Sequence, residues 1–351
     1  MKHTQTLKSI QMIRGIAAIL VVLYHINNLF LSNFNVHFSY GFFSPGSMGV
    51  DVFFVLSGFI MYYIHHSDIG KKSKLKNFAR KRFIRIYPVY WVVSFFLILL
   101  YLAIPSFGES YYRDPTFIIK SLILIPQSVQ PILGVAWSLT HEVYFYLIFA
   151  LLIIVNKKYY NLIIITWVTL TFLNIFIRTD NYFVNFLLNT YNFEFLLGGL
   201  VAFIVIKKIH FSYKFSINLA LGLFLISWLS NLFFSIDGYR VILWGIPSAL
   251  LLYGLVIKDL TLTKSPPKFL LFLGDASYSI YLTHIVGILF SVKVVEYLNL
   301  ESFTIHFFMP LLFLILIVIG CLFHVLIEKP LLKVLHKSNT KIEKSKIKMI
   351  S

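Results

Sequence analysis

The sequence predicts an all-α protein, a polytopic helical membrane protein with about ten transmembrane helices and both termini in the cytoplasm. Of its 351 residues 58% are hydrophobic and only 13% are charged, and the mean hydropathy is +0.81. Apolar stretches of membrane-spanning length recur along the chain, and Lys and Arg gather in alternate connecting segments. These three observations exclude a soluble domain.

Ten apolar segments are long enough to cross a bilayer. A further segment, 116–127, is apolar but short, so the sequence leaves open whether it is a re-entrant piece or an eleventh span. To within several residues, the expected spans are 12–31, 49–64, 87–105, 136–155, 160–177, 192–206, 217–234, 241–256, 278–295 and 307–327.

The charge distribution sets the expected orientation. With ten spans and a cytoplasmic N-terminus, 26 of the 31 Lys and Arg fall in cytoplasmic segments, which fits the positive-inside rule. The net charge of +17 then reflects topology and contact with anionic membrane lipids, and no nucleic-acid partner is predicted.

The chain reads as a single membrane domain, 1–335, followed by a lysine-rich tail, 336–351, that we expect to be disordered. Arg14 interrupts the first apolar run and no small-residue cleavage site follows, so this run is predicted to be a retained span. A single cysteine, Cys321, excludes an intramolecular disulfide and a multi-cysteine metal site. No metal ion or bound cofactor is predicted.

Arg14 and His25 lie eleven residues apart in the first span, so a helix places them on one face about 16 Å apart. Ionisable side chains are costly in lipid and are functional candidates by default. Asp51, at the outer end of the second span, either caps that helix or orients and charges His25. Glu142 either forms a structural ion pair or belongs to the reacting centre, because it is expected in the same outer half of the bilayer.

Further polar residues follow helical spacing. Tyr146 shares a face with Glu142 one turn deeper. In the ninth span Ser277, Tyr281 and His284 form one stripe, although a lone histidine in a membrane often serves only as a helix–helix hydrogen-bonder. His324 and Glu328 are four residues apart at the end of the tenth span, and we expect Glu328 to pair with a cytoplasmic arginine.

The strongest electrostatic feature is the segment 71–85, which includes Arg80, Arg82 and Arg85. One helical turn would present Arg82 and Arg85 together, and arginine binds phosphate through a bidentate fork. This pattern suits a polyphosphate ligand, whereas topology and lipid contact are the simpler explanation. The chain lacks a glycine-rich phosphate loop, which argues against a nucleoside-triphosphate motor.

Six of these segments, in this order, resemble the integral membrane acyltransferase family 3, and the sequence of residues 49–61 resembles its exopolysaccharide-acetylating branch. The matching pieces are Arg14-Gly15-x-Ala17 with His25, Gly49-Val50-Asp51-x-Phe53-Phe54-x-x-Ser57-Gly58-Phe59, Arg80-x-Arg82-x-x-Arg85-x-x-Pro88-x-x-Trp91, Trp137-Ser138-x-x-x-Glu142-x-x-x-Tyr146, Ser277-Tyr278-Ser279-x-Tyr281-Leu282-x-His284 and Glu328-Lys329-Pro330.

The resemblance implies an O-acyltransferase in a bacterial cytoplasmic (inner) membrane that moves an acyl group, usually acetyl from acetyl-CoA, to a hydroxyl of a polysaccharide. It implies that His25 is the catalytic base or carries the acyl group. Arg14, Arg80, Arg82 and Arg85 would engage the acyl-CoA co-substrate, and Glu142 and His284 match further polar positions of the family. A glycan or lipid-linked glycan acceptor, membrane lipids and polysaccharide-assembly proteins are the implied partners.

From this we expect neutral His25 to deprotonate the acceptor hydroxyl while Asp51 or Glu142 steadies the imidazolium, with an acyl-histidine intermediate as the competing route. Tyr146, Tyr281, His284 and Glu328 are additional site candidates. Three other functions stay open: acylation of a small-molecule acceptor, a channel or scaffold subunit of an export complex, and proton-coupled secondary transport, which buried charged residues also suit. The sequence contains no internal repeat that would favour transport.

Overall fold

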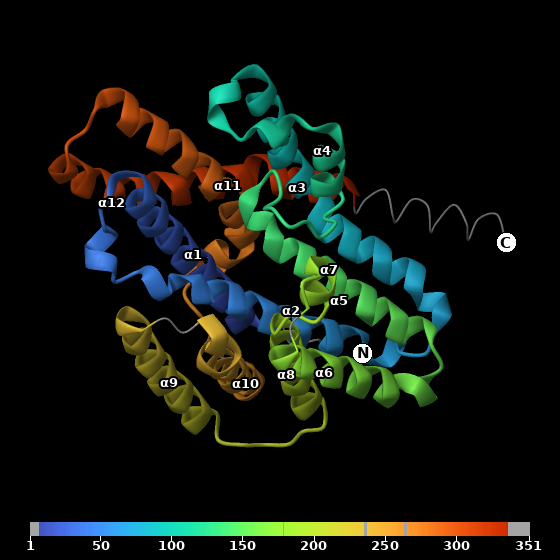
Figure 1. Ribbon diagram of the computed structural model, residues 1–351. Helices are drawn as coiled ribbons and strands as arrows, with labels where there is room; N and C mark the ends of the chain where they lie inside the picture. The colour runs from blue at the N-terminus through green and yellow to red at the C-terminus, as the bar shows by residue number, and fades with distance from the viewer. Residues whose placement is uncertain (1–6, 178, 235–236, 263–264, 336–351) are drawn as a thin grey trace.

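A computed structural model describes residues 7–177, 179–234, 237–262 and 265–335. Within these ranges the chain is helical without strands, and ten helices are long and apolar enough to cross a membrane (Figure 1). This confirms the predicted fold class, while the tail 336–351 lies outside the described residues. The helices are α1 (Lys8–Phe34), α2 (Met48–His65), α3 (Leu75–Ala103), α4 (Pro115–Leu122), α5 (Trp137–Ile154), α6 (Tyr160–Phe176), α7 (Tyr182–Leu187), α8 (Tyr191–Ile206), α9 (Tyr213–Phe233), α10 (Ile246–Thr261), α11 (Lys268–Leu298) and α12 (Ser302–Phe323).

The short apolar segment 116–127 is not an eleventh span. Its helix, α4, has eight residues and is about 12 Å long, too short to cross a bilayer. Asp114 caps it by accepting a hydrogen bond from the Phe117 amide at 2.7 Å, and Pro115 occupies the first turn. The hydroxyl of Tyr90 and the indole of Trp91, both on α3, donate to carbonyl oxygens at the end of α4 and hold it against the long helix.

Helix α3 begins earlier than the hydropathy pattern indicates. The expected span starts at residue 87, but the helix starts at Leu75, so most of the cationic segment 71–85 is helical rather than a loop. The arginines of this segment are therefore fixed on a continuous helix that packs within the bundle.

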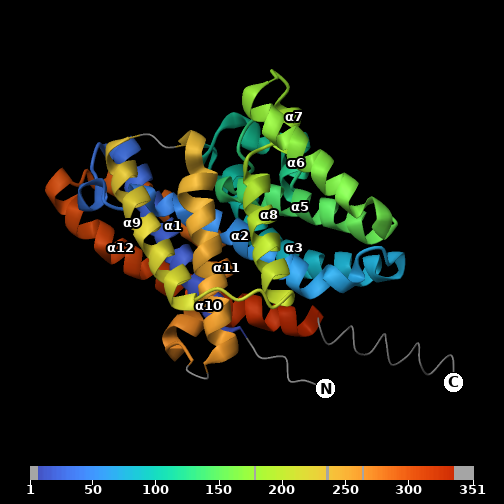
Figure 2. The ribbon, with the colours of Figure 1, turned by 90° about the horizontal axis from the view of Figure 1, so that it is seen from below.

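The helices divide into a buried centre and a lipid-facing perimeter (Figures 1 and 2). In α2 and α10, 61% of the apolar window is buried inside the protein, compared with 11% in α6 and 22% in both α9 and α12. The peripheral helices therefore present large apolar side chains outward, as lipid contact requires. Helices α1, α2 and α11 lie at the centre, where α1 packs along α11 and α2.

Two glycines let α1 and α11 cross in direct backbone contact. A Cβ atom added at Gly274 would lie 1.9 Å from the carbonyl oxygen of Gln11, and one at Gly15 would lie 2.9 Å from the Gly274 amide nitrogen. Small residues at such crossings allow membrane helices to approach closely. The two helices run in parallel, so successive turns of one face successive turns of the other.

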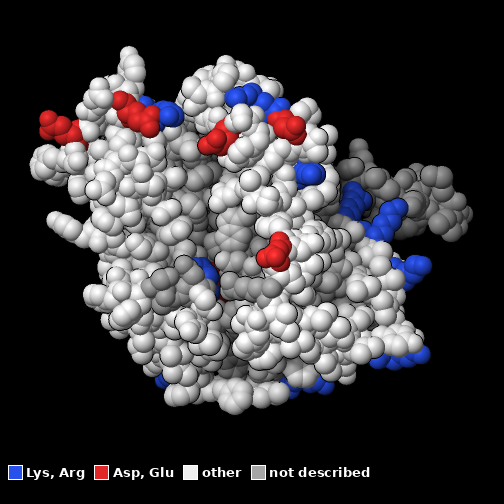
Figure 3. Space-filling view, in the orientation of Figure 1, with Lys and Arg blue, Asp and Glu red and all other residues white. Residues whose placement is uncertain are grey.

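Charged side chains are unevenly spread over the surface. On the face in Figure 3, acidic residues gather at the top, whereas most Lys and Arg lie along the right and lower edges. This separation agrees with the charge asymmetry in the sequence. The cytoplasmic placement of the two termini stays a prediction.

We expect Gly274→Ala to destabilise the protein because the added methyl group meets the backbone of α1, which cannot yield as a flexible side chain would. Overpacking of this kind costs about 1–3 kcal/mol. The matched control is Gly222→Ala in α9, where an added Cβ meets nothing within 4 Å. A lower thermal unfolding midpoint in detergent for Gly274→Ala, with no loss for Gly222→Ala, is the expected result. Equal midpoints for the two variants would contradict the close crossing.

Candidate active site

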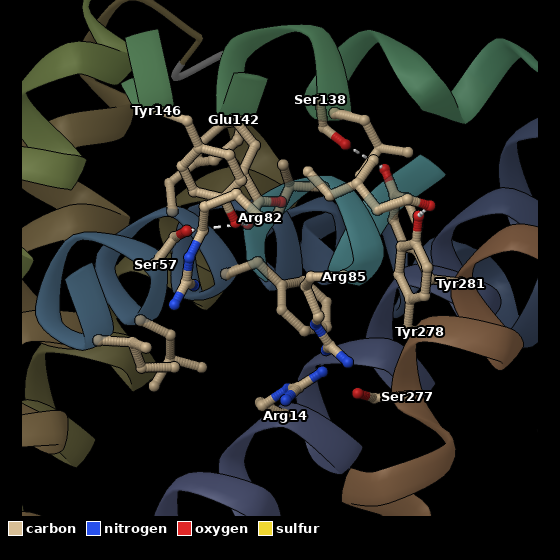
Figure 4. A pocket seen from close by; sticks show the side chains of 17 residues that line it. Arg14, Ser57, Arg82, Arg85, Ser138, Glu142, Tyr146, Ser277, Tyr278 and Tyr281 are labelled. Atoms are coloured by element: carbon tan, nitrogen blue, oxygen red, sulfur yellow. Dashed lines mark hydrogen bonds between the residues drawn. The ribbon is translucent and has the colours of Figure 1, made fainter. Parts of the chain in front are cut away.

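A cavity of about 330 Å³, called the arginine cavity below, lies between α1, α2, α3, α5 and α11 (Figure 4). It gathers polar side chains from five segments that are far apart in the sequence. Those side chains belong to Arg14, Ser57, Arg82, Arg85, Ser138, Glu142, Tyr146, Ser277, Tyr278 and Tyr281.

Three arginines and one glutamate line this cavity, so its walls carry an excess of positive charge. The guanidinium groups of Arg14 and Arg85 point toward one another beside Ser277 (Figure 4). Like charges held together away from bulk water repel strongly. An anion bound between them would remove this cost, and arginine forks match the geometry of phosphate.

Of the three arginines expected from α3, the structure brings Arg82 and Arg85 to the cavity but not Arg80. Helical geometry explains the difference. Arg82 and Arg85 are three residues apart and share a face, whereas Arg80 is rotated by about 200° from Arg82. The expectation that all three act together at one ligand is therefore corrected to a pair.

Arg82 is held in place by residues that the sequence reasoning missed. His65 faces it, with 3.3 Å between His65 Nε2 and the guanidinium, and His65 Nδ1 lies 2.9 Å from the Asp68 carboxylate. A carboxylate only accepts, so Nδ1 of a neutral His65 carries the hydrogen and Nε2 accepts from Arg82. The guanidinium also lies over the ring of Tyr146, 5.7 Å from its centroid. In the sequence, the i, i+3 spacing of His65 and Asp68 could have indicated that these two side chains interact.

Glu142 lies in the arginine cavity and not beside His25. One oxygen of its carboxylate accepts hydrogen bonds from Ser57, at 2.9 Å, and from the hydroxyl of Tyr146 one turn away. The expected shared face of Glu142 and Tyr146 is confirmed. The expectation that Glu142 supports the His25 imidazole is corrected, because its bonds and its neighbour Arg82 belong to the arginine cavity.

His25 instead meets His284, the last residue of the predicted stripe on α11. Their facing atoms, His25 Nδ1 and His284 Nε2, are 3.2 Å apart. Each Nδ1 also lies near a backbone carbonyl one turn earlier, Val21 at 2.9 Å from His25 and Ile280 at 3.1 Å from His284. Since carbonyl oxygens only accept, both Nδ1 atoms carry a hydrogen in the neutral rings. His284 Nε2 is then an acceptor for His25, and Nε2 of His25 keeps an unprotonated lone pair.

Tyr281 connects the cavity to this histidine pair. It lines the cavity, and its ring centroid lies 5.8 Å from that of His284. Its hydroxyl donates to the Val135 carbonyl at 2.8 Å and accepts from Ser138 at 2.7 Å. The cavity thus runs from the arginines at Arg14 to a wall that adjoins the two imidazoles.

Asp51 pairs with Arg240, which corrects both interpretations offered for it. Its two carboxylate oxygens accept hydrogen bonds from the Arg240 guanidinium, which also donates to Ser47. Asp51 therefore does not orient His25. It lies in the first turn of α2, where an acidic side chain favours the helix dipole, but the N-cap residue is Ser47, so Asp51 does not cap the helix. Burial alone would lower the pKa of Arg240, but the Asp51 carboxylate more than offsets this, so the pKa of Arg240 is raised. Glu194 is fully buried beside it.

Glu328 forms the arginine pair that the sequence predicts. It lies 3.9 Å from Arg85, and it also accepts from Ser279 at 2.6 Å and contacts His324 at 2.8 Å. Glu328 thereby ties the turn His324–Glu328, which follows α12, to the arginine end of the cavity. Among the described residues no group of three His, Cys, Asp or Glu side chains is arranged to hold a metal ion.

Comparison with known proteins identifies the family of the chain. A family model described as an acyltransferase domain matches residues 7–328. The chain belongs to this acyltransferase family. The resemblance drawn from the six motifs is confirmed, and the chain is a multi-pass membrane protein of that family.

Three curated relatives illustrate the range of matches. The exopolysaccharide production protein ExoZ of Rhizobium meliloti (strain 1021) is 34% identical over 114 residues, which cover 31% of this chain and 34% of ExoZ. The O-acetyltransferase OatA of Staphylococcus aureus (strain NCTC 8325 / PS 47) is 29% identical over 319 residues, 79% of this chain and 50% of OatA. A putative acetyltransferase, ORF330 of Acidianus two-tailed virus, is 26% identical over 84% of this chain and 91% of its own length. No solved structure matches.

Arg82 and Arg80 offer a direct test of the anion site. We expect Arg82→Ala to weaken coenzyme A binding roughly 10- to 100-fold, because hydrogen bonds to a charged group contribute about 1.5–3 kcal/mol. Arg80→Ala is the matched control, with the same residue type on the same helix but outside the cavity. Binding to purified protein in nanodiscs, measured by titration calorimetry, gives the two constants. Equal weakening by both variants would argue for a general electrostatic effect instead of a defined site.

Proposed function

We propose that the protein is a membrane-embedded O-acyltransferase of a bacterial cytoplasmic membrane. It moves an acyl group, in the first instance acetyl, from cytoplasmic acyl-CoA to a hydroxyl group of a surface or exported polysaccharide. The observation that carries the proposal is the single cavity that leads from three arginines to the wall beside the His25–His284 pair. Family membership supports the reaction class.

The two ends of the cavity suit the two ends of an acyl-CoA. The diphosphate and the 3′-phosphate are strongly anionic and match Arg14, Arg82 and Arg85. The pantetheine arm is narrow and uncharged, and along α1 the step from Arg14 to His25 is about 16 Å. An arm of this kind brings the thioester to the histidines while the phosphates stay at the arginines.

In the proposed reaction Nε2 of His25 takes the proton of the acceptor hydroxyl. The oxygen attacks the thioester carbonyl carbon, a carbon–oxygen ester bond forms and the carbon–sulfur bond breaks. The proton passes from the imidazolium to the departing thiolate, so coenzyme A leaves as a thiol. His284 Nε2 and the Val21 carbonyl accept from Nδ1–H throughout and stabilise the imidazolium, the role first expected of a carboxylate.

The remaining expectations belong to the same proposal. Membrane lipids surround the helices, a glycan or lipid-linked glycan is the acceptor, and polysaccharide-assembly proteins are candidate partners. Glu142 is assigned to the donor cavity, where it fixes Ser57 and Tyr146 beside Arg82. Asp51 is assigned to holding Arg240.

The first test is acetyl-CoA consumption by purified protein in detergent, with and without polysaccharide from a strain that lacks this gene. We expect acceptor-dependent release of coenzyme A, reduced at least 100-fold in His25→Ala because general acid–base catalysis contributes 10²- to 10⁴-fold. Rapid quenching with radioactive acetyl-CoA distinguishes the two routes, since a protein adduct lost in His25→Ala would favour acyl-histidine. Gradient-driven solute uptake that survives His25→Ala, without acetyl-CoA turnover, would instead identify a transporter.

A second test concerns His284 as a positioning residue. His284→Gln keeps an acceptor oxygen near the position of Nε2, whereas His284→Met has similar length and no strong acceptor. We expect His284→Met to lower kcat about 10- to 100-fold with little change in the KM for acetyl-CoA, and His284→Gln to recover a large part of the rate. If both variants lose the same activity, packing and not the hydrogen bond accounts for the residue.

A further inference from the structure

A second cavity, of about 370 Å³, opens at the N-terminal end of α5. It lies between the loop 125–131, the first turns of α5, helix α7 and the start of α8. The backbone of Gly70, in the basic connection before α3, bonds to Leu152 at the opposite end of α5. The two ends of this 18-residue helix are about 27 Å apart, so the second cavity lies across the membrane from the basic segment.

The lining of this outer cavity differs in charge from that of the arginine cavity. None of the described residues around it is Lys, Arg, Asp or Glu. Four aromatic rings, of Trp137, Tyr182, Phe186 and Tyr191, and the amide side chains of Gln127, Gln130 and Asn189 take their place. A lining of this kind does not compensate a charged ligand. It suits a neutral molecule that has both apolar faces and many hydrogen-bonding groups.

His141 adds a buried ring nitrogen whose hydrogen-bonding capacity the described residues leave unsatisfied. The residue lines the cavity and is only 6% exposed, and its ring stacks on Phe186 with 4.2 Å between centroids. Within the described part of the chain its Nδ1 has no hydrogen-bond partner. A buried ring nitrogen without a partner is costly, and a ligand hydroxyl can serve either tautomer because it both donates and accepts.

The outer cavity lies back to back with the arginine cavity. Trp137 lines the outer cavity and the next residue, Ser138, lines the arginine cavity, which is the inner of the two. Phe54 forms part of the partition between them. It lines the arginine cavity, and its ring centroid lies 6.3 Å from that of Trp137 and 5.1 Å from that of Tyr191. A ligand in the outer cavity is therefore separated by one layer of side chains from the end of the inner cavity that adjoins the histidines.

We propose that the outer cavity is a binding subsite for one sugar ring of the polysaccharide acceptor, at a distance from the sugar whose hydroxyl reacts. A pyranose has apolar C–H faces that stack on Trp137 and Tyr182, and its hydroxyls reach the amides of Gln127 and Gln130 beside the His141 ring. The proposal rests on the proposed acyltransferase function. It assigns recognition of the acceptor to a site whose residues, apart from Trp137, are not among those that the six motifs specify.

The test measures the KM of the acceptor as a function of glycan length. Polysaccharide from a strain that lacks this gene is partly hydrolysed and separated by size, and acetyl transfer from radioactive acetyl-CoA is followed for each fraction. The variants are Tyr182→Ala and Gln130→Ala, which alter exposed side chains of the outer cavity. Tyr159→Ala is the matched control, because Tyr159 is 45% exposed, compared with 44% for Tyr182, and lies at the other end of α5.

With the native protein we expect the acceptor KM to fall as the glycan lengthens, until one ring fills the subsite. Tyr182→Ala should remove most of this gain and raise the KM for long fractions roughly 3- to 10-fold, as the loss of one aromatic stacking contact does. Gln130→Ala should act in the same direction, and Tyr159→Ala should behave as native. The KM for acetyl-CoA and the rate with the shortest fraction should not change.

Two results would overturn the subsite. One is the same length dependence in Tyr182→Ala, Gln130→Ala and native protein. The other is an equal loss with short and long fractions, which would indicate a general defect. A native protein that turns over acetyl-CoA but shows no gain with length rejects the subsite alone, whereas absence of any turnover rejects the proposed function and the subsite together.

Discussion

The arrangement of the whole site depends on the direct backbone contact between α1 and α11. The glycines at this crossing remove the side chains that would hold the helices apart. Because the helices are parallel, Gly15 meets Gly274 and, ten residues further along each helix, His25 faces His284. A wider crossing would separate the two imidazoles and open the arginine cavity to lipid.

Electrostatics then divides the interior into distinct regions. The excess positive charge of the inner cavity is held on rigid supports, since Arg82 is fixed by His65 and Asp68, and Arg85 lies near Glu328. Asp51 and Arg240 neutralise one another elsewhere, so their charges do not disturb the histidine pair. The outer cavity carries no formal charge on its described lining. A charged ligand and a neutral one thus have separate places on either side of one layer of side chains.

Helical periodicity explains what could be anticipated. The common face of Arg82 and Arg85 and the stripe from Ser277 to His284 both follow from the local repeat of 3.6 residues. The same repeat, applied to Arg80, already separates it from Arg82. The partners of Asp51 and Glu142 could not be obtained this way, because similar depth in the membrane does not determine which neighbouring helix each side chain faces.

The sequence by itself determined the class of the protein and the family to which it belongs, because hydropathy, charge asymmetry and motif order are properties of the linear chain. Only the tertiary structure decided that His25 pairs with His284, that Glu142 belongs with the arginines and that a neutral cavity lies behind Trp137. Those relations depend on how each helix is rotated and how closely it crosses its neighbours. Rotation and crossing distance are set by side-chain packing over the entire bundle, which no local pattern encodes.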